Sequence, residues 1–335
     1  MKLIAGDIGG TKTTLALYDS GAGTRRPIVE KTYESSSYGS FEDVIRAFMS
    51  DFSLSDIHHA SFGVAGPIMG DRAEITNLKW VIEKSSLLQQ LGFSDILLIN
   101  DLEAVAHSID ILTSTDLEVI NEGSPVTHGP RAVIAPGTGL GEAYLSWDGS
   151  RYVPHASEGG HTEFGPSNAM EIELLSYLLK KFDHVSYELV CSGIGIPNIY
   201  DFLKDTGRYQ EPEWLADKIK KSPDRTPAIR IEAYESETRS EICRAAMEMF
   251  ISILGAEAGN LGLKVMATGG IYVGGGISPR IMPALREGTF LNAFFRKGRL
   301  SKVIRTMPVS VILNSGAGLM GAAAAGFNHL GVKAS

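Results

Sequence analysis

The chain has 335 residues, of which 44% are hydrophobic and 21% charged, which is typical of a globular protein and long enough for two domains. A net charge of −8 argues against a large nucleic-acid footprint and against binding to an anionic membrane surface. Two cysteines cannot build a disulfide framework or a cysteine zinc site, and no membrane span or leader peptide is visible, so we expect a cytoplasmic protein.

A β-hairpin with a glycine-rich turn is predicted at the start, from strands at 2–6 and 14–18. Its turn contains Asp7, Gly9, Gly10, Thr11 and Lys12. Glycines let a ligand approach the backbone, whose N–H groups suit phosphate oxygens, and a carboxylate suits the accompanying magnesium. The spacing fits neither the P-loop nor the dinucleotide-binding motif, and an ordinary glycine-rich hairpin is the alternative.

The rest of the first third alternates strands and helices. Hydrophobic patterns predict strands at 27–33, 58–64 and 96–99 and helices at 41–51 and 101–113. The strand at 96–99 runs directly into Asn100 and Asp101. An acid at this place is either a helix cap or a catalytic group, and the residues alone leave both interpretations open.

A second glycine hairpin is predicted further along the chain. A strand at 131–136 leads into Gly137, Thr138 and Gly139, and strands at 142–147 and 151–154 follow, joined by an Asp-Gly turn. This strand–loop–strand pattern repeats that of the first hairpin. We expect two phosphate-binding hairpins that face each other across a cleft.

The C-terminal half is predicted to be mostly helical. Helices are predicted at 169–181, 239–263 and 315–330, the last one rich in small residues, and peripheral helices and loops at 205–237. Strands are predicted at 265–268 and 271–273. They lead into Gly274, Gly275 and Gly276, which could lie against a nucleotide base or sugar.

In this order and spacing, the motifs resemble the sugar-kinase branch of the actin, hexokinase and heat-shock ATPase superfamily, and most closely the bacterial glucokinase family. They are GDIGGTKT (6–13), GVAGPI (63–68), INDLEAVAHSI (99–109), APGTGLGEA (135–143), ASEGGHTEFGP (156–166), YELVCSGIGI (187–196), GGIYVGGGI (269–277) and LNSGAGLMGAA (313–323). The neighbouring ROK family shares the first loop but carries a cysteine zinc cluster. This chain has no cysteine before Cys191, which argues against that family.

The resemblance implies an α/β, actin-like (ribonuclease-H-like) ATPase fold with two lobes and a cleft between them. The small α/β lobe would comprise residues 1–110 and 315–335, and the larger α+β lobe residues 111–314. It also implies an ATP-dependent glucokinase that phosphorylates the 6-hydroxyl of glucose, and a homodimer.

The resemblance further implies a role for each matched residue. Asp101 would be the general base. The glucose ligands would be Asn100, Asp101, Glu158, His161 and Glu188. Asp7 would hold Mg²⁺, and the remaining ATP contacts would come from Gly9, Gly10, Thr11, Gly137, Thr138, Gly139, Gly274, Gly275 and Gly276. We expect Lys12 to be solvated, and we discount a metal site at His161 and Glu163 because a third ligand is missing.

Several alternatives stay open at this point. A kinase for another hexose is the nearest, because small changes in a pocket shift sugar preference only modestly. The others are a catalytically silent sugar sensor, against which the retained Asp7, Asp101 and both phosphate loops argue, and an actin-like or chaperone-like ATPase, against which the sugar residues and the short chain argue. Polyphosphate could replace ATP as donor, since hairpin N–H groups bind any such chain.

Overall fold

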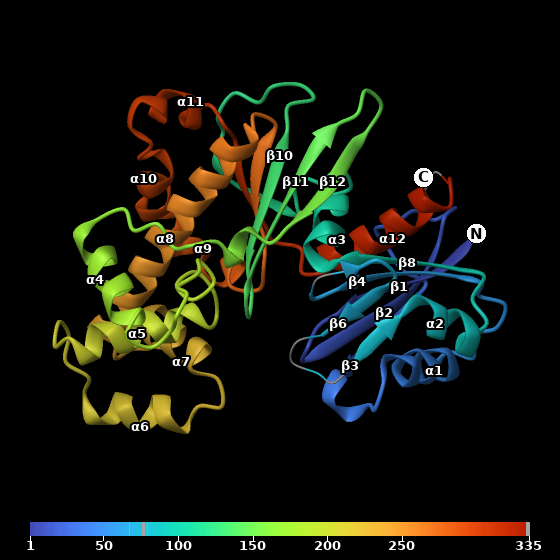
Figure 1. Ribbon diagram of the computed structural model, residues 1–335, viewed down its shortest axis with the longest axis horizontal. Coiled ribbons are helices and arrows are strands. Elements are labelled where there is room, and N and C mark those ends of the chain that lie inside the picture. The colour runs from blue at the N-terminus through green and yellow to red at the C-terminus, as the bar shows by residue number, and fades with distance from the viewer. Residues whose placement is uncertain (67, 76–77, 79, 333–335) are drawn as a thin grey trace. The chain divides into compact units, whose positions relative to one another are not determined.

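The computed structural model describes residues 1–66, 68–75, 78 and 80–332. These residues form two compact units. The first comprises Met1–Leu117, Asp148–Ala156 and Leu313–Ser335, and the second Glu118–Trp147 and Ser157–Ile312. Each unit is built on a mixed β-sheet with helices packed against it (Figure 1).

The first unit contains a five-stranded sheet in the order β3-β2-β1-β4-β8. Its strands are β1 (Lys2–Ile8), β2 (Lys12–Asp19), β3 (Val29–Glu34), β4 (His59–Val64) and β8 (Asp95–Asn100). The β1–β2 hairpin is antiparallel, whereas β1–β4 and β4–β8 are parallel pairs. The five predicted strands are confirmed. A small sheet of β5 (Ile68–Met69), β6 (Arg72–Glu74) and β7 (Val81–Glu83) was not predicted.

Helices α1 (Phe41–Asp51), α2 (Lys84–Leu91), α3 (Asp101–Ser108) and α12 (Ala317–His329) and the 3₁₀ turn η1 (Ser35–Ser37) complete the first unit. The predictions of α1 and α12 are confirmed. The predicted helix at 101–113 is too long, because the N–H of Thr113 bonds instead to the carboxylate of Asp116 at 2.8 Å. Pro67, part of the 63–68 motif, lies outside the described residues.

The second unit is built on a six-stranded sheet in the order β12-β11-β10-β13-β14-β9, of which residues 117 and 152–156 at the outer strands are counted with the first unit. Its strands are β9 (Leu117–Asn121), β10 (Arg131–Pro136), β11 (Leu140–Trp147), β12 (Tyr152–Ser157), β13 (Gly270–Val273) and β14 (Val309–Ile312). The β10–β11 pair is the second predicted hairpin, and it is antiparallel as expected. Strands β10 and β13 are parallel, so their carboxyl ends lie at the same edge of the sheet.

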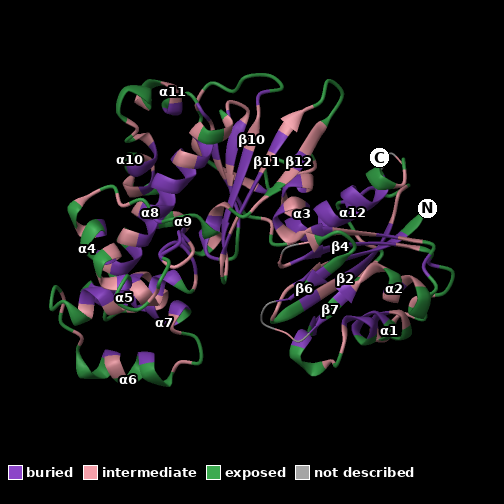
Figure 2. Cartoon of the chain, viewed as in Figure 1, coloured by how far each residue is buried: buried purple, intermediate pink, exposed green. Residues whose placement is uncertain are grey.

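One long helix, α8 (Glu241–Val265), is buried along most of its length and organises the core of this unit (Figure 2). The other helices and 3₁₀ turns are η2 (Gly159–His161), α4 (Ala169–Leu178), α5 (Gly195–Asp205), α6 (Glu213–Lys221), α7 (Arg225–Tyr234), η3 (Ser278–Ile281), α9 (Met282–Arg286), α10 (Thr289–Phe295), η4 (Gly298–Leu300) and α11 (Ser301–Arg305). Among the helices described, none is long and apolar enough to span a membrane.

The predicted strand at 265–268 is wrong. Helix α8 continues through Val265 and ends at Met266, which has a left-handed backbone with φ of 50°. The N–H of Ala267 then returns to the carbonyl of Gly262 at 2.9 Å, which closes the helix. Apolar residues at the end of a buried helix resemble a short strand in sequence, which explains the error.

Candidate active site

In the first unit, the strand register brings the predicted magnesium ligand and the predicted base to one edge of the sheet. Ile8 of β1 pairs with Val64 of β4, which pairs with Asn100 of β8. Asp7 precedes the first member of this row, and Asp101 follows the last. Both acids therefore lie at the carboxyl edge of parallel strands, where ligands bind in open α/β sheets.

Asp7 lies against the first turn of α12. A Cβ atom on Gly318 would be 3.1 Å from Asp7 Oδ2, so only a residue without a side chain leaves room for this carboxylate. Burial raises the pKa of Asp7 to about 6. A carboxyl that is costly to ionise alone is stabilised in its charged form by a nearby cation.

The turn of the first hairpin is held by its own backbone and by Ser35. Gly9 donates to the carbonyl of Lys12 at 2.9 Å. The Ser35 hydroxyl donates to the carbonyl of Gly9 at 2.9 Å, and the Ser35 N–H donates to the carbonyl of Thr11 at 3.0 Å. Thr11 and Lys12 are exposed at its tip. No motif points to Ser35, which is distant in the chain and outside the glycine-rich turn.

Asn100 and Asp101 have separate structural roles. Asn100 is the N-cap of α3, and its Oδ1 accepts from the N–H groups of Leu102 and Glu103. Its Nδ2 donates to the carbonyl of Gly66 at 3.2 Å. Asp101 is half-buried in the first helical turn, with Oδ1 2.9 Å from the N–H of Leu102. The capping role proposed as the alternative for Asp101 is therefore filled by Asn100.

In the second unit, the 137–139 loop is closed by its own backbone and contacts the segment before α5. Gly137 donates to the carbonyl of Gly139 at 2.9 Å. The N–H groups of Gly193 and Ile194 donate to the carbonyls of Gly137 and Thr138. The carbonyls of the loop are therefore all hydrogen-bonded to backbone N–H groups, and the loop lies at the carboxyl end of β10.

The three glycines after β13 differ in what they contact. Gly274 donates to the carbonyl of Ile134 at 2.8 Å. Gly275 has a positive φ of 76°, and a Cβ there would be 2.3 Å from the carbonyl oxygen of Pro136. Gly276 lines a cavity. Gly275 is thus required by the packing of β13 against β10, whereas a Cβ atom on Gly276 would be 3.2 Å from Arg280 Nη1 at the cavity wall.

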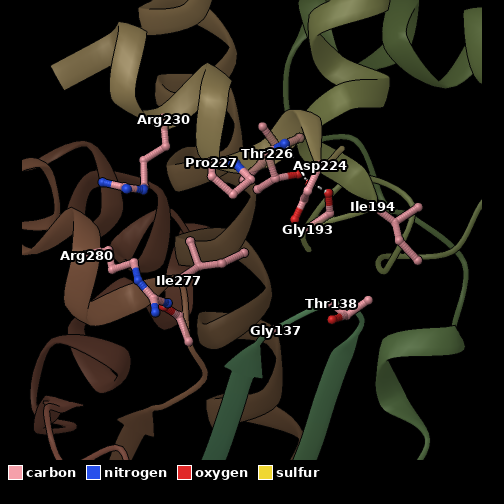
Figure 3. A pocket seen from close by; sticks show the side chains of 12 residues that line it. Gly137, Thr138, Gly193, Ile194, Asp224, Thr226, Pro227, Arg230, Ile277 and Arg280 are labelled. Atoms are coloured by element: carbon pink, nitrogen blue, oxygen red, sulfur yellow. Dashed lines mark hydrogen bonds between the residues drawn. The ribbon is translucent and has the colours of Figure 1, made fainter. Parts of the chain in front are cut away.

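The cavity has a volume of about 610 Å³ and is contained within the second unit (Figure 3). Its lining comes from the 137–138 loop, the start of α5, α7 and the segment 276–280: Gly137, Thr138, Gly193, Ile194, Ile196, Asp224, Thr226, Pro227, Arg230, Gly276, Ile277 and Arg280. The guanidinium groups of Arg230 and Arg280 lie on the same side in Figure 3, opposite Ile194. Arg280 donates to the carbonyl of Gly276, and Asp224 caps α7.

Helix α7 is a part of the site that the sequence analysis missed. It lies within residues 205–237, which were expected to be peripheral helices and loops, and the helices are confirmed. Four residues of the cavity wall nevertheless come from this segment. No glycine loop or acidic motif marks them, so only the fold brings them to the hairpin.

The predicted sugar residues of the second unit gather around one turn. Glu158 and His161 flank η2, with His161 Nε2 3.9 Å from Glu158 Oε2, and both side chains are about 60% exposed. Glu188 lies beside the same turn, since its N–H donates to the carbonyl of Gly160 at 2.9 Å. Its Oε2 accepts from the N–H of Leu140 at 3.0 Å, which ties it to the phosphate hairpin.

A single carboxylate can be sufficient for magnesium at a nucleotide site. Mg²⁺ keeps several waters and takes one or two carboxylates together with phosphate oxygens. Asp7 fits this pattern as a half-buried acid beside the donor-rich turn. Within the described residues no group of three or more His, Cys, Asp or Glu could form an all-protein metal site, including the discounted pair His161 and Glu163.

Comparison with known proteins identifies the family. A family model described as Glucokinase matches residues 4–329. A glucokinase of Nostoc punctiforme is 39% identical over 334 residues, spanning 96% of this chain and 97% of its own. A glucokinase of Neisseria gonorrhoeae is 36% identical over 331 residues, which cover 98% of this chain and 95% of that protein.

Solved structures agree on the fold. The glucokinase from an Antarctic psychrotroph is 29% identical, with a TM-score of 0.79 and coverage of 98% of this chain and 99% of its own. A ROK family glucokinase from Streptomyces griseus, solved with glucose and AMPPNP, is 20% identical with a TM-score of 0.66, which is a likeness of fold. The expected α/β actin-like fold is confirmed, and the chain belongs to the glucokinase family.

Proposed function

We propose that this protein is an ATP-dependent glucokinase that transfers the γ-phosphate of ATP to the 6-hydroxyl of glucose. The observation that carries the proposal is the row of paired residues Ile8, Val64 and Asn100, which sets Asp7 and Asp101 at one edge of one sheet. One acid is then available for the metal of the donor and the other for the hydroxyl of the acceptor. Membership of the glucokinase family supports the same assignment.

The donor is a nucleotide rather than polyphosphate. A cavity of about 610 Å³ continues from the Gly137–Thr138 loop, within the range of cavities that hold small ligands. Polyphosphate needs only donors along a surface, whereas a nucleoside needs an enclosed volume beside the phosphate loop. Gly276 would let the adenine or ribose lie close to the backbone.

Asp7 would hold Mg²⁺, with Gly9, Gly10 and Thr11 toward the terminal phosphates. When bound, the ion supplies neutralisation of the charge that develops on the transferred phosphoryl group. The protein's own contribution is the N–H groups of the turn and a carboxylate that Gly318 leaves room for.

Asp101 accepts the proton of the 6-hydroxyl and orients its oxygen for attack. Asn100, Glu158, His161 and Glu188 hold the other hydroxyls of the sugar, each of which needs a partner once buried. Asn100 uses its oxygen for the α3 cap, so its amide N–H is the group offered to glucose. Asn100 and Asp101 belong to the first unit, and Glu158, His161 and Glu188 to the second.

The deciding experiment measures glucose 6-phosphate formation by the purified protein with ATP, ADP and polyphosphate as donors. Of the three donors, we expect only ATP to give product, and only when Mg²⁺ is present. Among a panel of hexoses, we expect glucose to be the preferred acceptor. Product formed from polyphosphate at a rate similar to that with ATP would overturn the donor assignment. A preference for another hexose would overturn the acceptor assignment. Absence of product with every donor would overturn the proposal. A homodimer and a cytoplasmic location remain predictions, the first to be checked by sedimentation.

A further inference from the structure

Glu142 is a buried acid that the proposed phosphoryl transfer does not use. It lies on β11, its residue exposure is 1%, and its Oε1 has no hydrogen-bond partner among the described residues. Burial, and then the carboxylate of Glu257, raise its pKa to about 7, while Lys264 opposes the rise. A buried polar atom without a partner costs stability, so this group is not explained by the stability of the fold.

The neighbouring buried charges do not need Glu142 either. The carboxylate of Glu257 accepts from Asn260 Nδ2 at 2.8 Å and from Lys264 Nζ at 3.0 Å. Asn260 Oδ1 accepts in turn from Lys297 Nζ at 2.6 Å. This network pairs its own charges, and Glu142 adds like charge to it when ionised.

The carboxyl of Glu142 lies directly under the turn that carries Glu158 and His161. A Cβ atom on Gly159 would be 1.9 Å from Glu142 Oε2 and 2.7 Å from its Cδ. The acid thus fills the space that a side chain at position 159 would occupy. Residue 159 is glycine because the carboxyl is there.

The same strand supports the next residue of the turn. A Cβ atom on Gly160 would be 2.0 Å from the carbonyl oxygen of Leu140. Leu140 also donates its N–H to Glu188 Oε2 at 3.0 Å. Residues 140 and 142 of β11 therefore form a floor under Glu158–His161, and this strand begins at the phosphate hairpin.

We propose that Glu142 is a positioning residue for the sugar site. Its carboxyl, packed against Gly159, fixes the position of the turn whose side chains Glu158 and His161 would bind glucose. The inference rests on the proposed glucokinase activity. It explains why a costly buried acid stands under the turn, since local rules of stability are broken mainly where function requires it. Glu142 does not contact the sugar itself and acts through the backbone of the turn.

The test compares Glu142→Ala, Glu142→Gln, Gly159→Ala and the double variant Glu142→Ala/Gly159→Ala. We expect Glu142→Ala and Gly159→Ala each to raise the KM for glucose at least ~10-fold, since small displacements of binding groups are costly. The KM for ATP should stay within ~3-fold, and the isosteric Glu142→Gln should keep a near-normal glucose KM. The double variant should have a lower glucose KM than Gly159→Ala, because the methyl group then has room.

Glu171→Ala is the matched control, an acid of α4 that is also 1% exposed but fully bonded by Ser167 and Asn168. It should lower Tm more than Glu142→Ala does and leave the glucose KM unchanged. An unchanged glucose KM in Glu142→Ala, or additive effects in the double variant, would overturn the inference. If the wild-type protein forms no glucose 6-phosphate, the proposed function has failed, which is a separate result.

Discussion

Two adjacent residues at the start of α3 differ in their structural role. Asn100 caps the helix, while Asp101 in the first turn is not needed for the cap. A change at Asp101 can therefore test chemistry without releasing the helix. The structure assigns the cap to Asn100, and the catalytic role of Asp101 stays a prediction.

We predict that Asp101→Asn lowers kcat at least ~100-fold, the effect expected when a general base is lost. Glucose affinity and Tm should stay near those of the wild type, because the amide keeps the shape of the side chain. Steady-state kinetics and calorimetric titration with glucose measure the two. Glu103→Gln is the control, a half-buried acid of the same helical turn that should keep normal turnover. Near-normal turnover of Asp101→Asn would exclude Asp101 as the base.

His107 on the same helix makes stability depend on pH. Burial, and then the charge of Arg151, lower the pKa of its imidazole to about 4. The unfolded chain therefore binds a proton at a higher pH than the folded one. The stability due to neutral His107 is complete above about pH 6.5 and is lost as the pH falls toward 4.

We predict that His107→Gln loses about 2 kcal/mol less unfolding free energy than the wild type between pH 7 and pH 5. Urea unfolding of both proteins at the two pH values measures the difference, and other titrating groups cancel in the comparison. Parallel losses in the two proteins would show that His107 is accessible to protonation in the folded state.

At the scale of elements, the small residues of α12 let it cross α3 closely. A Cβ atom on Gly321 would be 1.7 Å from the carbonyl oxygen of Ala104 and 3.0 Å from the N–H nitrogen of Ser108. A larger residue at 321 must push apart two helices of the first unit. One of them begins with Asp101, so the crossing also fixes the position of the proposed base.

We predict that Gly321→Ala lowers the unfolding free energy by about 3 kcal/mol through overpacking, despite the better helix propensity of alanine. It should also lower kcat through the displaced α3. Gly316→Ala is the control: Gly316 caps the same helix, and its nearest neighbour is a side-chain oxygen at 3.3 Å. Urea unfolding measures the unfolding free energy of both variants, and steady-state kinetics measure their kcat. Equal, small effects would mean that the two helices adjust freely.

Elements with a clear hydrophobic period were predictable, and those defined by context were not. The strands at 2–6 and 131–136 and the helix at 41–51 are confirmed because burial of one face or both leaves a periodic signal. The end of α8 was misread, because Val265 and Met266 are apolar whether they close a helix or form a strand. The strands at 68–83 are too short to leave a pattern.

At the scale of the whole molecule, the motifs predict where the site lies but do not reveal which glycines would serve a ligand. Gly139, Gly159, Gly160 and Gly275 are required by contacts with Glu188, Glu142, Leu140 and Pro136 of the chain itself. A glycine needed for internal packing and one needed for a phosphate have the same letter. The part of the cavity wall on α7 was not predicted for a related reason, since only tertiary packing brings it to the 137–138 loop.

The residues proposed for the sugar come from both units, and the part of each residue can be tested by stability. Glucose at ~100 times its Kd should stabilise the folded protein by about 2.7 kcal/mol and raise Tm accordingly. We predict that Asn100→Asp in the first unit and Glu158→Gln in the second each remove most of this shift. Aspartate caps a helix as well as asparagine, so the first change keeps the cap of α3 while removing the amide donor, together with its hydrogen bond to the carbonyl of Gly66. Glu163→Gln, an exposed acid near the same turn, should keep the full shift. A full shift in either sugar-site variant would mean that its unit takes no part in holding glucose.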